Sequence, residues 1–139
     1  MKTTMKSAIE KILGTYGILE AFQSASEYAV KIENEGFMPL CIEKHGTQIT
    51  VTHYFEMNGD LIADPDMEFT TEIDPTAWLP VAIQHSTGHY YRALIKDEDG
   101  RWKASRKQLK DQQSFASMWA RNLLQQGFAS GHLVRAEVI

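Results

Sequence analysis

Residues 49–60 read Ile49-Thr50-Val51-Thr52-His53-Tyr54-Phe55-Glu56-Met57-Asn58-Gly59-Asp60, and this stretch decides the fold. Its odd positions up to Met57 are apolar except for His53, and its even positions are polar or amphipathic. A period of two indicates a β-strand with one buried face. Asn58-Gly59 then supplies two residues that tolerate a positive φ, the strongest short signal for a two-residue turn. The stretch therefore predicts an antiparallel β-hairpin.

Further strands are expected on both sides of this hairpin, at 28–33, 38–44, 67–73, 78–85 and 90–96. Asp64-Pro65-Asp66 is expected to break the chain. Pro80 suggests an edge strand, because proline has no N–H for a sheet ladder. Together these segments predict an antiparallel sheet of about five to six strands.

Helices are expected at both ends of the chain. Apolar residues at helical spacing predict a helix from Met5 to Leu13 and a short one from Tyr16 to Phe22. The clearest element is an amphipathic helix over 106–127, preceded by Ser105 at capping-box spacing from Gln108. Its predicted buried face comprises Leu109, Gln112, Phe115, Ala116, Trp119, Ala120 and Leu123. The pattern predicts an α+β fold, with the C-terminal helix packed on one face of the sheet.

The chain length of 139 residues predicts a single domain over 1–139. Its expected parts are a helical and strand lead-in over 1–36, the sheet over 37–105 and the helix over 106–127. Residues 132–139 are expected to add a short strand or to form a loose tail. An exposed sheet edge near Pro80 or at His132–Ile139 would favour a homodimer.

Cysteine usage and hydropathy bound the compartment. The only cysteine, Cys41, excludes an intramolecular disulfide and a zinc site built on several thiolates. Cys41 lies in an apolar run and is expected to be a small core residue; as a nucleophile it would need a base that the sequence does not indicate. No apolar run resembles a signal peptide or reaches 18 residues, so we expect a cytoplasmic protein with no membrane contact.

The charge of the chain, −4 in total, is segregated. Between Lys44 and Arg92 there are seven acidic residues and no Lys or Arg, whereas Arg92 to Arg121 holds eight basic and four acidic residues. The two segments either pair with each other within the fold or form separate acidic and basic faces for different partners. We expect intramolecular pairing, because it requires no partner.

The hairpin contains the first group of candidate site residues. With Asn58-Gly59 as the turn, His53 would lie opposite Asp64, within hydrogen-bonding reach. A carboxylate that orients an imidazole suits a general base or a metal ligand. A semi-buried structural histidine, or a longer loop that pairs 67–73 with 49–55, are the alternatives. The candidate binding surface comprises His53, Tyr54, Asn58, Asp60, Asp64 and Asp66.

Two further groups could carry chemistry. His85 and His89 flank a three-residue loop and could bind zinc if His53 or Asp64 added a ligand, although exposed loop histidines are commoner. Bases crowd the start of the C-terminal helix, where the helix dipole disfavours them, which predicts an anion-binding surface. That surface comprises Lys103, Arg106, Lys107 and Lys110, with Trp102 beside it as a base-stacking or a core residue.

Recognised nucleotide-binding and hydrolase motifs are absent. The sequence has no P-loop, no Gly-x-Gly-x-x-Gly, no Gly-x-Ser-x-Gly and no His-Glu-x-x-His. We therefore expect no cofactor, and whether a metal binds is left open. These absences disfavour nucleotide hydrolysis, dinucleotide redox chemistry and acyl transfer.

One string resembles a known family. His53-Tyr54-Phe55-Glu56-Met57-Asn58-Gly59-Asp60-Leu61, followed by Asp64-Pro65-Asp66-Met67-Glu68-Phe69, is similar to a family of small bacterial proteins classed as a domain of unknown function. The similarity continues through Trp78-Leu79-Pro80 and Gln84 to Trp119 and Gln126-Gly127-Phe128, so it covers about 37–128. The resemblance implies carriage on plasmids, integrative elements or phages, and it transfers no catalytic residue. His85 departs from the Asp that the family pattern implies after Gln84.

The sequence thus predicts a non-enzymatic binding protein of a mobile element, with an anti-defence or DNA-transfer role and an unidentified protein or nucleic-acid partner. One alternative is a small metal-dependent hydrolase or nuclease that uses His53, Asp60 and Asp64. The other is a nucleic-acid-binding module that uses the basic start of the C-terminal helix, against which the overall acidity counts.

Overall fold

The computed structural model describes residues 3–139, whose helices are α1 (Met5–Thr15), α2 (Leu19–Ser24), α3 (Arg106–Gln125) and the short 3-10 helix η1 (Phe128–Ser130). The strands are β1 (Glu27–Glu33), β2 (Leu40–His45), β3 (Gln48–Met57), β4 (Asp60–Thr70), β5 (Leu79–Gln84), β6 (Tyr90–Arg92), β7 (Leu94–Lys96), β8 (Trp102–Ala104) and β9 (His132–Val138). Each predicted helix and strand has a counterpart, except that the single strand expected over 90–96 is divided into β6 and β7, which belong to different sheets. The C-terminal residues form a strand rather than a loose tail.

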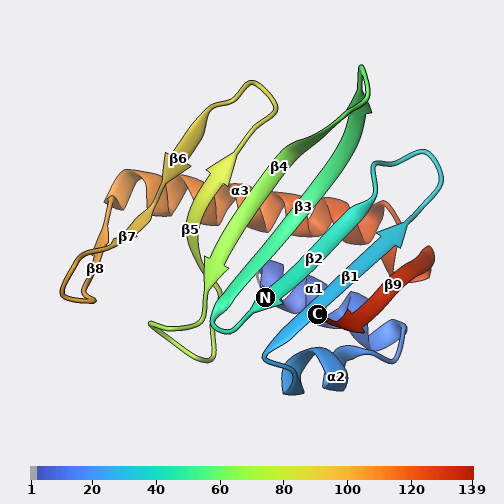
Figure 1. The fold of residues 1–139 in the computed structure, drawn as a ribbon, viewed down its shortest axis with the longest axis horizontal. Coiled ribbons are helices and arrows are strands. Elements are labelled where there is room, and N and C mark those ends of the chain that lie inside the picture. The colour runs from blue at the N-terminus through green and yellow to red at the C-terminus, as the bar shows by residue number, and fades with distance from the viewer. Residues whose placement is uncertain (1–2) are drawn as a thin grey trace.

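The strands form a fully antiparallel sheet in the order β6-β5-β4-β3-β2-β1-β9, and β7 and β8 form a separate two-stranded sheet. From β1 to β6 the chain is a meander, in which each strand pairs with the next. After α3 the chain returns, and β9 adds to the other edge beside β1 (Figure 1). The main sheet therefore has seven strands rather than five to six. The predicted number was too low because β9 pairs with β1, which lies near the other end of the sequence, so no hairpin turn marks this pairing.

The helices lie on one face of the sheet. Figure 1 shows α3 running behind the strands and α1 behind the centre of the sheet, whereas the face toward the viewer carries no helix. Between the layers lies one large core, to which α1 contributes Ile9, Ile12 and Leu13 and α3 contributes Trp119 and Leu123. This uncovered face is polar in alternate residues of each strand, as expected for an antiparallel sheet with one solvated side.

The β3–β4 hairpin has the predicted turn but not the predicted register throughout. Asn58 and Gly59 both have positive φ, Met57 pairs with Asp60, and Phe55 pairs with Ile62. Between Tyr54 and Thr52 the β3–β4 register shifts by one residue, because β4 holds one extra residue at Asp64-Pro65. A β-bulge of this kind re-aims the side chains around it. Hence β4 continues through Asp64-Pro65-Asp66 instead of breaking there, and Met67 to Thr70 pair with Gln48 to Val51.

Pro80 lies in β5, which is an interior strand between β4 and β6, so the edge prediction is wrong for the strand as a whole. The sheet accommodates the proline in two ways. The β4–β5 register shifts between Glu68 and Phe69, next to the Phe69–Pro80 pair. β6 pairs only with Ala82 to Gln84, so it ends before Pro80. The missing N–H therefore falls where no regular ladder bond is needed.

Both long helices begin with a hydroxyl cap. Thr4 and Ser7 form a reciprocal capping box at α1, and the Ser105 hydroxyl accepts from the Gln108 N–H at α3. α1 continues through Gly14 to Thr15, and α3 ends at Gln125, two residues before its predicted end. None of the helices within residues 3–139 is both long and apolar enough to span a membrane.

Candidate functional site

His53, the centre of the predicted hairpin site, is a core residue. Its ring is 6% exposed and lies between Trp119 and Phe128, with ring centroids 5.4 and 5.6 Å away. Its Nδ1 lies 3.2 Å from the Pro39 carbonyl oxygen, which makes that nitrogen the N–H donor. His53 points to the helix-covered face because it alternates in β3 with Ile49 and Val51, and the bulge at Asp64-Pro65 leaves it without a regular partner in β4, so it is not paired with Asp64 as predicted.

Burial lowers the pKa of His53, against smaller raising effects from the backbone carbonyls of Pro39 and Met38 and from the charge of Asp64. The imidazole is therefore neutral at neutral pH and is held within aromatic side chains. This arrangement fits the alternative interpretation of the sequence, a structural histidine.

Asp64 instead lies 3.8 Å from Nδ1 of His85, at the start of the β5–β6 loop. The predicted three-residue loop is present, since the His85 N–H donates to the His89 carbonyl. The two rings nevertheless diverge: His85 packs edge-on against Phe115, and His89 packs against Tyr91. Across residues 3–139, no three His, Cys, Asp or Glu side chains are grouped to hold a metal ion.

The remaining predicted residues lie at distant places. Asn58 and Asp60 are exposed at the tip of the β3–β4 hairpin, away from His53. The His53, Asp60 and Asp64 set of the metal-dependent alternative is therefore not brought together.

The four bases of the predicted anion-binding surface are all exposed near the start of α3, where Lys107 pairs with Asp111 at 3.0 Å. They are Lys103, Arg106, Lys107 and Lys110. Trp102 is half-buried and packs against a small cluster around Val81 and Leu94.

The segregated charges pair little with each other. In the described part of the chain, the Lys96–Glu72 pair at 2.6 Å is the one ion pair that joins the basic segment to the acidic one. The other ion pair of the basic segment among the described residues is local, between Lys107 and Asp111 on α3. The expectation that the two segments neutralise each other within the fold is therefore met at a single point.

A polar group does form on the uncovered face of the sheet. Strand register places Cys41 opposite Thr52, and Thr52 opposite Asp66. The Thr52 hydroxyl donates to Asp66 Oδ1 at 3.0 Å. Tyr54, two residues along β3, projects to the same face as Thr52. Two residues of the predicted binding surface, Tyr54 and Asp66, thus share one site with Cys41 and with Thr52, which the sequence analysis did not single out.

This polar group is partly desolvated. Burial raises the pKa of Asp66, an effect that the Thr52 hydrogen bond reduces, and burial together with the Asp66 charge raises the pKa of Tyr54. Burial likewise raises the pKa of the Cys41 thiol. A thiol with a raised pKa is a poor nucleophile at neutral pH. Cys41 is half-buried on the uncovered face, so it is not part of the core between sheet and helices as its apolar run predicted.

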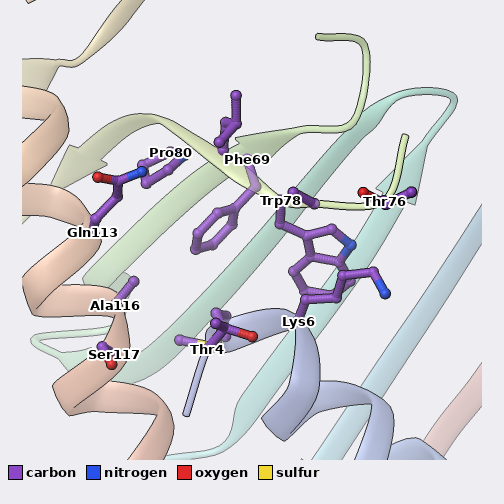
Figure 2. A pocket seen from close by; sticks show the side chains of 12 residues that line it. Thr4, Lys6, Phe69, Thr76, Trp78, Pro80, Gln113, Ala116 and Ser117 are labelled. Carbon is purple, nitrogen blue, oxygen red and sulfur yellow. The ribbon is translucent and has the colours of Figure 1, made fainter. Parts of the chain in front are cut away.

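A cleft of about 400 Å³ lies on the helix-covered side (Figure 2). It lies between the start of α1, the middle of α3 and the connection from β4 to β5. Its lining comprises Thr4, Met5, Lys6, Phe69, Thr76, Ala77, Trp78, Leu79, Pro80, Gln113, Ala116 and Ser117. Figure 2 shows Phe69 and Trp78 side by side along one wall, with Gln113, Ala116 and Ser117 of α3 facing them.

The chemistry of the cleft is apolar with a few hydrogen-bonding groups. Trp78 packs on Phe69 and on Phe22, which holds its indole ring in place as a wall. Lys6 is the one ionisable side chain among the lining residues, and its ammonium lies 3.2 Å from Glu10. The Ser117 hydroxyl donates to the Thr3 carbonyl, which ties α3 to the residue before α1. The cleft contains no carboxylate, imidazole or thiol that could act as a general base.

Sequence reasoning did not find this cleft. Its lining comes from three segments that are far apart in the chain, and no spacing rule joins Thr4 to Trp78 or Ser117. The one sequence signal near the cleft is the family resemblance, whose matching residues include Trp78.

A second hollow, of about 370 Å³, lies between the β5–β6 hairpin and α3. It is lined by Ile83, His85, Tyr91, Lys107, Gln108, Asp111, Gln112 and Phe115. Gln112 is 2% exposed; its Nε2 donates to the Tyr91 carbonyl, while its Oε1 has no hydrogen-bond partner. This hollow brings His85 close to the predicted anion-binding surface, through Lys107.

Comparison with known proteins gives one match. No curated protein and no solved structure matches the chain. The family described as "Domain of unknown function (DUF6908)" matches residues 7–129, which run from the first turn of α1 into η1. The match begins well before residue 37, so the N-terminal helices and β1 are part of the family domain. Since this match covers most of the sequence, the chain belongs to the DUF6908 family.

Proposed function

We propose that the protein is a non-enzymatic binding protein and that the cleft between α1, α3 and the β4–β5 connection holds an apolar group of its partner. The observation that carries the proposal is the lining of the cleft, which combines fixed aromatic walls with hydroxyl and amide groups and has Lys6 as its one ionisable side chain. Enclosed apolar hollows with a few convergent polar groups are where proteins usually hold ligands. The lack of a general base among the lining residues favours binding over catalysis.

The lining also defines the group that fits. Trp78 and Phe69 offer flat apolar surface, which suits an aromatic or branched aliphatic side chain presented by a protein partner. The Gln113 amide lies on an exposed residue at the cleft, where it can hydrogen-bond the backbone next to that side chain. The Thr76 hydroxyl donates to Asp74 and can still accept a hydrogen bond there. The ammonium of Lys6 favours a neutral or acidic partner segment over a basic one.

The test uses anilinonaphthalene sulfonate, a fluorescent aromatic anion, as the probe. Gln113→Trp places a large ring from an exposed α3 position into the cleft without crowding the core, whereas Gln125→Trp makes the same change on α3 outside the cleft lining. We expect probe affinity to fall about tenfold in Gln113→Trp and to stay unchanged in Gln125→Trp.

Equal binding by both variants would show that the cleft is not the binding site. Turnover of an ester, phosphoester or peptide substrate that is lost in Trp78→Ala would show instead that the site is catalytic. Circular dichroism of each variant establishes that the fold is retained.

We further propose that the partner belongs to a mobile element or its host, in an anti-defence or DNA-transfer role. The support is the resemblance of the string from His53 to Phe69, and the lack of a catalytic group in the cleft agrees with an accessory role. Expression of wild type and Gln113→Trp in a bacterial host, followed by counts of phage plaques and of plasmid transfer, tests this. A phenotype that depends on the open cleft is expected; no difference from an empty vector in either assay would refute it.

A further inference from the structure

The two edges of the main sheet differ in a way that bears on assembly. β6 closes one edge with three residues, Tyr90–Arg92, and short edge strands resist pairing with other chains. β9 forms the other edge with seven residues, and within residues 3–139 nothing pairs with its outer side. Its apolar side chains Val134 and Val138 are 46% and 68% exposed. The ladder of β9 with β1 is regular from Arg135 to Val138 and shifts register between Arg135 and Leu133, where Val134 is the extra residue. The regular stretch, which has no proline and ends on an exposed valine, is a surface suited to strand addition.

The hydrogen-bonding groups on the free side of β9 follow from its pairing with β1. The Ile139 N–H donates to the Glu27 carbonyl, so the odd residues Glu137 and Arg135 direct their backbone groups toward β1. Ala136 and Val138 therefore direct their N–H and C=O groups outward, to the free edge. Figure 1 shows β9 at the margin of the sheet, beside β1, with no strand beyond it.

We propose that β9 pairs antiparallel with β9 of a second copy of this chain, with the two-fold axis at Ala136, so that the two sheets join into one. In this register Ala136 exchanges two backbone hydrogen bonds with its own counterpart. Arg135 lies opposite Glu137 of the second copy, and all of these residues belong to the regular stretch of β9.

Charge selects this register from its neighbours. Residues whose backbone groups face the free edge must pair with each other. The neighbouring registers are therefore those in which one strand is displaced along the other by two residues. One such shift sets Arg135 opposite Arg135 of the second copy, and the other sets Glu137 opposite Glu137. Like charges directly opposite each other destabilise a strand pair, whereas opposite charges contribute about 0.2–1 kcal/mol. Only pairing about Ala136 makes both cross-strand charge pairs attractive.

The side chains agree with this arrangement on both faces. Arg135 pairs with Lys31 and Glu137 with Ala29, so both charges lie on the uncovered polar face. Within one chain Arg135 already forms an ion pair with Glu137, and pairing about Ala136 adds a second acceptor for each guanidinium. A two-fold axis perpendicular to the sheet places the helix layers of both copies on the same side of the joined sheet.

Sedimentation velocity over a range up to about 200 μM tests the proposal, since the monomer mass is 15.8 kDa. We expect wild type to form a dimer. Arg135→Glu and Glu137→Arg should each weaken the dimer by about tenfold or more, because each replaces two attractive pairs with repulsive ones. The double variant Arg135→Glu/Glu137→Arg restores opposite charges at every pair and should dimerise like wild type.

Arg101→Glu, at the exposed turn before β8, makes the same change in net charge away from the edge and should leave the dimer intact. Ala136→Pro removes the central outward N–H while it spares the ladder with β1, so it should yield a folded monomer even if the charge variants unfold. A monomeric wild type over the whole range would overturn the proposal. So would a dimer that survives both single charge reversals and Ala136→Pro.

Discussion

Thr52 and Asp66 lie opposite each other on the uncovered face of the sheet, and the Thr52 hydroxyl donates to Asp66 Oδ1 at 3.0 Å. The pair shows how this face is built. Neither side chain reaches the helix layer, yet Thr52 is 2% exposed because longer neighbours cover it. A carboxylate in such surroundings loses hydration and keeps one strong hydrogen bond in return.

Asp66→Asn should stabilise the protein at neutral pH. Burial raises the pKa of Asp66 above its usual value of 3.8, so the folded state holds the proton more tightly than the unfolded state. The contribution of Asp66 to stability therefore falls as the pH rises through its folded pKa. Urea unfolding should show a gain of at most about 1 kcal/mol at neutral pH, and no gain below pH 3.8. Thr52→Val, which removes the donor, should destabilise at neutral pH; stabilisation there would contradict this account.

His53→Ala should cost about 2–4 kcal/mol of unfolding free energy, because it leaves a cavity between Trp119 and Phe128. The lowered pKa of His53 has a pH consequence as well. The unfolded chain takes up a proton near pH 6.5 and the folded chain does so at lower pH, so stability is lost as the pH falls below 6.5.

His53→Phe keeps a ring at this position but has no titrating group there. As the pH is lowered from 6.5, the free energy of unfolding of His53→Phe should fall less than that of wild type. His45, whose pKa is raised first by Glu27, acts with the opposite sign, but it is present in both proteins and cancels in the comparison. Parallel pH curves for wild type and His53→Phe would refute a buried neutral imidazole.

Gly59→Ala should destabilise the β3–β4 hairpin by about 1–2 kcal/mol. Gly59 has a φ of +83°, and a Cβ there would meet nothing within 4 Å, so backbone strain alone sets the cost. Asn58→Gly, at the other turn position with a φ of 53°, is the matched control and should change stability by less than about 0.5 kcal/mol. Thermal unfolding measures both, and equal effects would argue against the two-residue turn.

Gln112→Met should be nearly neutral or slightly stabilising, within about 1 kcal/mol. The change removes the donor to the Tyr91 carbonyl, which lies on an exposed strand and can bind water instead. It also removes the buried Oε1, which has no partner. Chemical denaturation that shows a loss above about 2 kcal/mol would mean that Oε1 is satisfied by a bound molecule in the hollow beside His85.

The local elements of this fold could be predicted from the sequence. The Asn58-Gly59 turn, the alternation of β3 and the buried face of α3 all depend on residues a few positions apart, so period and turn chemistry reveal them. The predicted candidate surface fared differently. That prediction assumed a regular β3–β4 ladder from Asp60 to Asp64. The extra residue at Asp64-Pro65 shifts the pairing by one residue, so Thr52 rather than His53 has a partner beyond the bulge, and that partner is Asp66.

By itself, then, the sequence determined the antiparallel α+β class, the central hairpin turn and the amphipathic C-terminal helix. Only the tertiary structure decided that His53 is enclosed by Trp119 and Phe128, that Thr4, Trp78 and Ser117 line one cleft, and that β9 forms an open edge beside β1. The physical reason is distance along the chain. Periodicity and turn chemistry depend on residues a few positions apart. The burial of a side chain, the lining of a cleft and the edges of a sheet depend on how segments far apart in the sequence pack together.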